Sequence, residues 1–381
     1  MRSTRAALAA LGAALVPGLL AAQVPPPPSA ALTAQRIAEA EPILSSLVES
    51  YGVSGMEGPV RDLVQSLLPA WAKAETDTAG NLLIRAGTGD PLVVFVAHMD
   101  EIGYRVTALR EDGSLDVERQ GGFYPSLYEG RPALVHTGAR SVPGVFRPRD
   151  TDTSASAEER ARGAKRTPPP LRVDVGTTSR AATEAMGIRE GSTVTMPKSY
   201  QRLAGSRATA RSFDDRVGCT ALLLALRRID PKRLRHEVLF IFSVREETGL
   251  DGARVAAAAL GTKPVRVHAV DTFVSADSPL ELPNFGLAPL GLGAVARALD
   301  NSSATPPAYL DTLRIIARSR TIPLQVGATN GGNDGSTFAP YGVPDVALGW
   351  PLRYSHSPAE VVDLKDVVAL AEMVQAAAEA W

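Results

Sequence analysis

The hydrophobic pattern of this chain alternates between short buried strands and amphipathic helices. Apolar, β-rich runs at 92–96, 238–244, 265–270 and 346–350 are each short enough for a buried strand. Apolar residues at helical spacing follow at 219–226, and helix-forming sequence closes the chain at 364–380. Strands that alternate with helices predict an α/β fold, with a mixed sheet and helices on both faces.

A central stretch departs from this pattern. Residues 107–207 hold short alternating runs among glycines and prolines, which predicts a small, β-barrel-like inserted domain. Within it, residues 147–170 are polar, rich in Ala, Arg and Pro, and without periodicity, which indicates a mobile loop. The expected division is a larger domain in two parts, 31–106 and 208–381, around an insert at 107–207.

The N-terminus is typical of a secretory signal at residues 1–22. Arg2 and Arg5 precede an apolar run at 6–22 that ends in small residues. A disordered Ala-rich tail is the alternative. Residues 23–30 are proline-rich and predict an extended tether. Because no other stretch is long and apolar enough to span a bilayer, we expect a periplasmic or secreted protein, free of the membrane once the signal is removed.

Composition narrows the possible chemistry. The chain has 40 basic and 41 acidic residues, a formal net charge of −1 and no basic stripe, so nucleic acid is not an expected partner. Its single cysteine, Cys219, excludes an internal disulfide and a cysteine-based metal cluster. Any metal site must therefore use His, Asp and Glu.

Four polar residues of these types follow predicted buried strands, and a fifth, Asp214, opens a predicted helix. The carboxyl ends of strands in an open α/β sheet form the usual ligand crevice. Two histidines and three carboxylates suit zinc, cobalt or manganese, and they exceed the three ligands of a simple catalytic zinc. The set predicts two divalent ions that share one carboxylate. The candidate ligands are His98, Asp214, Glu247, Asp271 and His356.

Each candidate also has an ordinary structural explanation. His98 fits a buried structural histidine, His356 a surface histidine, and the Asp214–Asp215 pair a helix cap. Asp100 could accept the free ring N–H of His98. On an extended segment, neighbouring glutamates would point in opposite directions, so one of the pair at 246–247 could hold a metal while the other moves a proton.

Several motifs, in order, resemble the M42 metallo-aminopeptidases, the glutamyl-aminopeptidase or tetrahedral-aminopeptidase family of the di-zinc exopeptidase clan. They are VAHMDEIGY (96–104), SFDDRVGC (212–219), FSVREETGLDGA (242–253), AVDT (269–272), GGNDG (331–335) and RYSHSPAEVVDLKD (353–366). The resemblance covers most of the chain from about residue 53 and implies a di-zinc exopeptidase sandwich fold.

The resemblance also implies roles for single residues. One metal would be held by His98, Asp214 and Asp271, and the second by Asp214, Glu247 and His356. Asp100 would orient His98, and Glu246 would be the general base. The family further implies a cis peptide bond between Asp214 and Asp215 and homo-oligomers built through the insert.

The implied activity is removal of N-terminal residues from short peptides, with two divalent ions, zinc or cobalt, and a metal-bridged water as nucleophile. A di-metal deacylase of N-acyl amino acids is the alternative within the clan, and a catalytically silent peptide-binding protein is the alternative outside it. Thr248 and Asn333 depart from the family pattern, as does the signal-like N-terminus. The preferred N-terminal residue, native metal and oligomer size do not follow from the motifs.

Overall fold

The computed structural model describes residues 30–138, 140–149, 170–275, 277 and 287–380. The expected signal at 1–22, nearly all of the tether and most of the expected loop at 147–170 lie outside the described residues and stay predictions. Within the described ranges, no helix combines the length and apolar character needed to cross a membrane.

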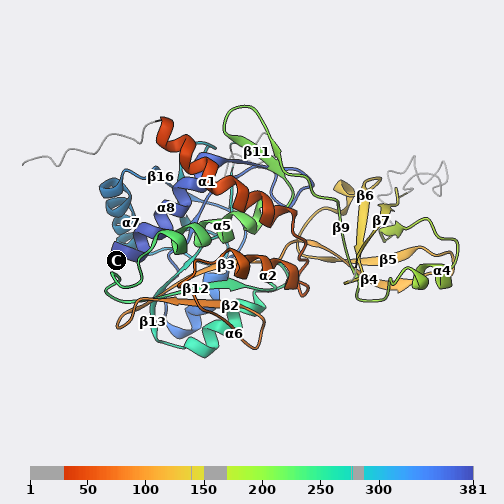
Figure 1. Ribbon diagram of the computed structural model, residues 1–381, viewed down its shortest axis with the longest axis horizontal. Coiled ribbons are helices and arrows are strands. Elements are labelled where there is room, and N and C mark those ends of the chain that lie inside the picture. Colours follow the sequence, from red (N-terminus) through yellow and green to blue (C-terminus); the bar gives the residue numbers. More distant parts are fainter. Residues whose placement is uncertain (1–29, 139, 150–169, 276, 278–286, 381) are drawn as a thin grey trace, which may run out of the picture.

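The larger body of the molecule is built on a five-stranded sheet (Figure 1). From one edge of the sheet to the other, the first two strand pairings are antiparallel and the last two are parallel. In sheet order the strands are β1 (Ala74–Thr76), β2 (Leu82–Ala86), β12 (Glu237–Ser243), β3 (Leu92–His98) and β13 (Pro264–Ala269). The predicted mixed α/β sheet is therefore confirmed.

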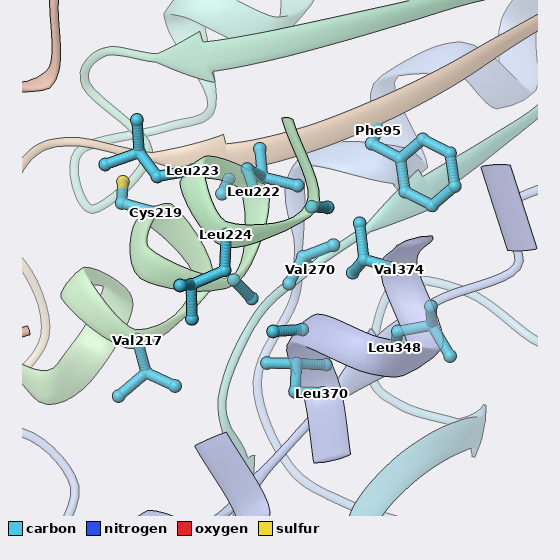
Figure 2. Packing of buried hydrophobic residues seen from close by; sticks show 14 of the residues in the cluster. Phe95, Val217, Cys219, Leu222, Leu223, Leu224, Val270, Leu348, Leu370 and Val374 are labelled. Carbon is cyan, nitrogen blue, oxygen red and sulfur yellow. The ribbon is translucent and has the colours of Figure 1, made fainter. Parts of the chain in front are cut away.

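Helices cover both faces of this sheet, as predicted. Alternate residues of β3 enter two separate cores: Phe95 packs with α1 (Ala30–Glu49), α5 (Phe213–Arg228) and α8 (Leu364–Ala380), whereas Val94 packs with α6 (Asp251–Leu260). Figure 2 shows part of the first core, with Phe95 of β3, leucines of α5, and Leu370 and Val374 of α8. A strand buried on both faces is apolar throughout, which explains its unbroken hydrophobic run. The remaining helices of this body are α2 (Gly58–Leu67), α7 (Pro307–Arg320) and the 3₁₀ helix η2 (Asp334–Tyr341).

Short strands complete the larger body. The predicted strand at 346–350 forms instead as β17 (Leu348–Gly349) and β18 (Pro351–Leu352), on either side of Trp350. The chain switches there from pairing with β15 (Ala294–Leu299) to pairing with β14 (Phe273–Val274). Two further short strands of this body are β16 (Leu324–Ala328) and β19 (Glu360–Asp363).

A closed barrel projects from one end of this body (Figure 1). Its strands are β4 (Gly103–Leu109), β5 (Leu115–Gln120), β6 (Pro132–His136), β7 (Ser141–Phe146), β8 (Arg172–Asp174) and β9 (Thr193–Thr195), with α4 (Arg180–Ala185) and η1 (Pro125–Leu127) in its connections. The barrel has its own apolar core. It begins at Gly103 and ends at Thr195. The next strands, β10 (Gln201–Arg202) and β11 (Arg207–Ala210), pair with each other and β11 with β19, so they extend the larger body.

Candidate metal centre

Asp214 lies between two histidines that are far apart in the sequence. Its Oδ1 is 3.2 Å from Nε2 of His98, the last residue of β3, and its Oδ2 is 3.4 Å from Nε2 of His356. Glu247 Oε1 is 3.3 Å from the same His356 nitrogen. Ligand atoms of His98, Asp214 and Glu247 all lie within 4.8 Å of one another, which is close enough for shared cations.

Asp271, the remaining predicted ligand, follows β13 at the same edge of the sheet. It lines a cavity of about 320 Å³ together with Asp214, Glu247 and His356. Its Oδ1 accepts a 2.5 Å hydrogen bond from the Thr272 N–H, and its Oδ2 lies 3.4 Å from Arg297 Nη1. Four of the five predicted ligands therefore line one cavity, and the fifth, His98, contacts Asp214.

Both histidines are held by their Nδ1 atoms. His356 Nδ1 donates to the carbonyl of Gly122 at 2.7 Å, and its Nε2 faces Asp214 and Glu247. His98 Nδ1 lies 3.3 Å from Asp100 Oδ1. Proteins usually orient metal-binding histidines through such a contact at the second ring nitrogen.

The two adjacent glutamates do not lie on an extended strand, which corrects the sequence-based interpretation. β12 ends at Ser243, Arg245 has a φ of 53°, and a turn begins at Glu247. The N–H groups of Glu246 and Glu247 both donate to the Asp100 carboxylate, at 3.0 and 3.2 Å. Both side chains consequently line the same cavity instead of opposite faces. Glu246 Oε2 lies 3.9 Å from His98 Nε2, whereas Glu247 lies beside His356.

The protonation equilibria of this cluster are strongly perturbed. Burial raises the pKa of Glu246 well above its usual range, and the neighbouring Asp271 and Glu247 carboxylates add to the shift. Burial likewise raises the pKa of Asp271 to about 7. Burial would also raise the pKa of Asp214, but His356 and His98 outweigh it and hold that pKa below its usual range. A buried cluster with surplus carboxylates favours cations, so this donor set fits divalent metal ions.

Comparisons with known proteins agree with this arrangement of candidate ligands. The family model described as M42 glutamyl aminopeptidase matches residues 80–373. This chain belongs to the M42 family. It is accordingly a hydrolase of the aminopeptidase type, from a family whose members depend on metal.

Individual M42 relatives align over most of the chain. The lysyl aminopeptidase of Pyrococcus furiosus is 31% identical over 85% of this chain and 92% of its own length. A putative aminopeptidase of Escherichia coli, FrvX, is 29% identical over 87% of this chain and 93% of its own length. The solved structure of the Pyrococcus horikoshii TET1 peptidase, which can assemble into a tetrahedron or a large octahedral shell, superposes with a TM-score of 0.80 at 29% identity. It covers 90% of this chain and all of its own.

The two aspartates at the start of α5 of this M42 hydrolase have different surroundings. The Asp214–Asp215 peptide bond is cis, as the family resemblance implied. Asp215 accepts hydrogen bonds from the N–H groups of His98 and Gly218, both at 2.9 Å, so its carboxylate is already hydrogen-bonded to the backbone. Asp214 alone of the pair lines the cavity. Sequence alone left this choice open, since either residue suits a helix start.

Three residues beside the centre have left-handed backbone: Ser212 (φ 69°), Arg245 (φ 53°) and His356 (φ 59°). Non-glycine residues adopt this conformation at a cost that the surrounding structure must offset. A buried carboxylate accepts a hydrogen bond from each of them, from the Ser212 hydroxyl to Glu101 and from the backbone N–H groups of Arg245 and His356 to Glu57 and Glu360.

Glu360 connects two of the segments that carry candidate ligands. Its carboxylate accepts the N–H of Phe213, next to Asp214, at 2.7 Å and the N–H of His356 at 2.9 Å. Burial and the Asp214 carboxylate raise its pKa to about 8. Sequence reasoning missed Glu360 and likewise Arg297, because their value lies in contacts with residues distant in the chain.

Proposed function

We propose that this protein is a two-metal aminopeptidase that removes N-terminal residues from short peptides. The observation that carries the proposal is the position of Asp214, with one carboxylate oxygen facing each histidine. His98, Asp214 and Asp271 would hold one ion, and Asp214, Glu247 and His356 the other. When bound, such ions would polarise the scissile carbonyl and lower the pKa of an attacking water.

Glu246 is the residue we assign to proton transfer. Its carboxylate lines the cavity 3.9 Å from His98 Nε2 and is not among the proposed ligands, so it is available to accept a proton from water and return it to the leaving amine. Asp100 supports this role, because it accepts the N–H of Glu246 and contacts the ring of His98. Asp100 therefore positions the base and one histidine together.

The test is a comparison of substrates with matched side chains. The purified protein, loaded with zinc or cobalt, should hydrolyse aminoacyl anilides, and blocking the substrate amine by acetylation should abolish hydrolysis. Zinc and cobalt are our proposed ions, and both should be assayed. Hydrolysis of N-acyl amino acids in place of aminoacyl anilides would contradict the proposal and identify a deacylase.

We also propose that the chain forms homo-oligomers through its barrel. Support comes from the similar TET1 peptidase, which assembles into closed shells, and from the barrel's position at one end of the body. Sedimentation of the full-length protein should show a species larger than a monomer. Crosslinking with mass spectrometry should place inter-chain links on barrel residues, and links confined to the larger body would contradict the barrel's role.

A further inference from the structure

The cavity beside the metal centre has a second, apolar wall. The segment between β5 and β6 of the barrel supplies Phe123, Tyr124 and Leu127, and β14 supplies Val274. Phe123 is buried, whereas Tyr124 and Leu127 keep 77% and 40% of their surface exposed. Exposed apolar side chains beside a reaction centre provide area that a substrate side chain can cover.

Apart from Glu246 and the proposed metal ligands, the charge found among the described residues of this cavity is already engaged within the protein. Among the described lining residues, Arg297 is the only charged one besides Glu246 and the proposed metal ligands. Arg297 is 2% exposed and pairs with Asp271 and Asp300. Its guanidinium also donates to the backbone carbonyls of Thr272 and Gly332. This arginine therefore has both its charge and its terminal nitrogens satisfied within the protein.

Among the described lining residues, the apolar wall offers no free partner to a charged substrate side chain. An unpaired charge placed against Phe123, Leu127 and Val274 would lose part of its hydration without gaining a partner, which is unfavourable. An apolar side chain gains about 25 cal/mol for each Å² that it removes from water. The wall thus selects substrates first by the charge of the N-terminal side chain and only then by its size.

We infer that the enzyme selects peptides whose N-terminal residue has a neutral, apolar side chain and rejects N-terminal Lys, Asp and Glu. The inference rests on the proposed aminopeptidase function and adds the substrate class. It differs from the names glutamyl and lysyl carried by the family and by the Pyrococcus furiosus relative. It also gives the barrel a part in specificity, separate from assembly.

One hydrogen bond connects the barrel segment of the apolar wall to the proposed metal centre. The Gly122 carbonyl, next to Phe123, accepts from His356 Nδ1 at 2.7 Å. The segment that carries the apolar wall is thereby fixed to a proposed metal ligand. A side chain lying against this wall keeps a defined position relative to the metal centre.

The first test compares aminoacyl anilides of Leu, Met, Phe, Lys and Glu on the zinc-loaded protein. We expect kcat/KM for the Leu, Met and Phe substrates to exceed the values for Lys and Glu by at least ~10-fold, since pocket contacts of this kind are worth roughly 10–200-fold. Faster hydrolysis of the Lys or Glu substrate would overturn the inference and leave the proposed function intact. No hydrolysis of any substrate by protein with bound metal would instead contradict the proposed function.

The second test places a carboxylate in the wall. Leu127→Asp should raise the ratio of kcat/KM for the Lys substrate to that for the Leu substrate by at least ~10-fold, because an ammonium then finds a partner. The matched control is Leu292→Asp, a 58% exposed leucine outside this cavity, which should leave the ratio unchanged. Metal content and melting temperature check that both variants fold. An unchanged ratio in a folded, metal-loaded Leu127→Asp protein would overturn the inference.

Discussion

At the scale of single residues, Glu246 and Glu247 have nearly the same backbone anchor but different neighbours. Both N–H groups donate to Asp100, while Glu246 faces His98 and Glu247 faces His356. The longer distance of Glu246 to its histidine, 3.9 Å against 3.3 Å, leaves it the freer of the two to exchange a proton. The proposed division between base and ligand follows from this difference.

Substitution by glutamine separates the two roles. Glu246→Gln keeps the shape but accepts no proton, so kcat should fall by about 10²–10⁴-fold with metal content unchanged and KM little affected. Glu247→Gln should weaken binding of one ion, and its activity should partly recover at high metal concentration. Metal analysis and kinetics on both variants check this. Metal loss from Glu246→Gln alone would mean that the roles are reversed.

Glu101 is a second residue whose effect reaches far beyond its own position. It is fully buried and contacts Lys198 Nζ at 2.8 Å, Arg211, and Arg216 Nη2 at 3.6 Å. Burial would raise its pKa, but the three cations outweigh burial and hold the pKa far below the usual value of 4.5. Through these ion pairs, Glu101 also connects Lys198, which follows the barrel, to Arg211 and Arg216 near the start of α5.

Glu101→Gln should destabilise the protein by about 3–5 kcal/mol, because it leaves buried cations without their carboxylate. The native carboxylate has a depressed pKa, so its stabilisation is present above pH 4.5 and is lost as the pH falls further. Urea unfolding between pH 7 and pH 3 should show a smaller acid loss in the variant. Glu237→Gln, which breaks the exposed pair with Arg85, should cost under about 1 kcal/mol; equal costs would contradict the assignment.

At the scale of elements, α5 joins the catalytic edge of the sheet to the main core. Its N-terminal end carries Asp214, and its buried leucines lie in the core shared with α8 (Figure 2) and with α1. Packing of this kind fixes the helix axis, so the position of Asp214 depends on apolar contacts as well as on polar ones. Truncation of a core side chain behind α5 should therefore lower the free energy of unfolding before it affects catalysis.

Leu222→Ala should lower the free energy of unfolding by about 2–5 kcal/mol, because Leu222 is fully buried in this core and its truncation leaves a cavity. Ile315→Ala on α7 is the control, since Ile315 is 65% exposed and should change stability by less than about 0.5 kcal/mol. Urea unfolding measures both. A Leu222 variant as stable as the control would show that α5 is not held by this core.

At the scale of the whole molecule, the proposed metal centre brings together segments that are far apart in the chain. The sheet supplies His98, the start of α5 supplies Asp214, and the loop after β18 supplies His356, which also contacts the barrel at Gly122. Ions bound here would add stability to the folded state alone, since the unfolded chain does not bring these ligands together.

Elemental analysis should therefore find about two ions per chain after saturation with zinc or cobalt. Chelation should abolish activity and lower the melting temperature, and returning the metal should restore both. His356→Ala, which removes a proposed ligand of one ion only, should retain about one ion. A saturated wild-type protein that holds one ion or none would contradict the shared role of Asp214.

The sequence by itself determined the local features of this protein. Apolar runs at 92–96 and 238–244 predicted β3 and β12 because a strand buried on both faces must be apolar throughout. The spacing of Leu222, Leu223 and Leu226 predicted α5, and glycine-rich alternation predicted the barrel. Candidate ligands were predictable because carboxyl ends of parallel strands meet at one edge.

Only the tertiary structure decided which of these residues meet and how. Asp214 lines the cavity because Asp215 is already bonded to the backbone of His98, and Glu246 and Glu247 share a cavity because the chain turns after Arg245. Glu360 and the barrel wall gain their importance from contacts more than a hundred residues away. Such contacts leave no local pattern, because they depend on how packed elements approach each other in space.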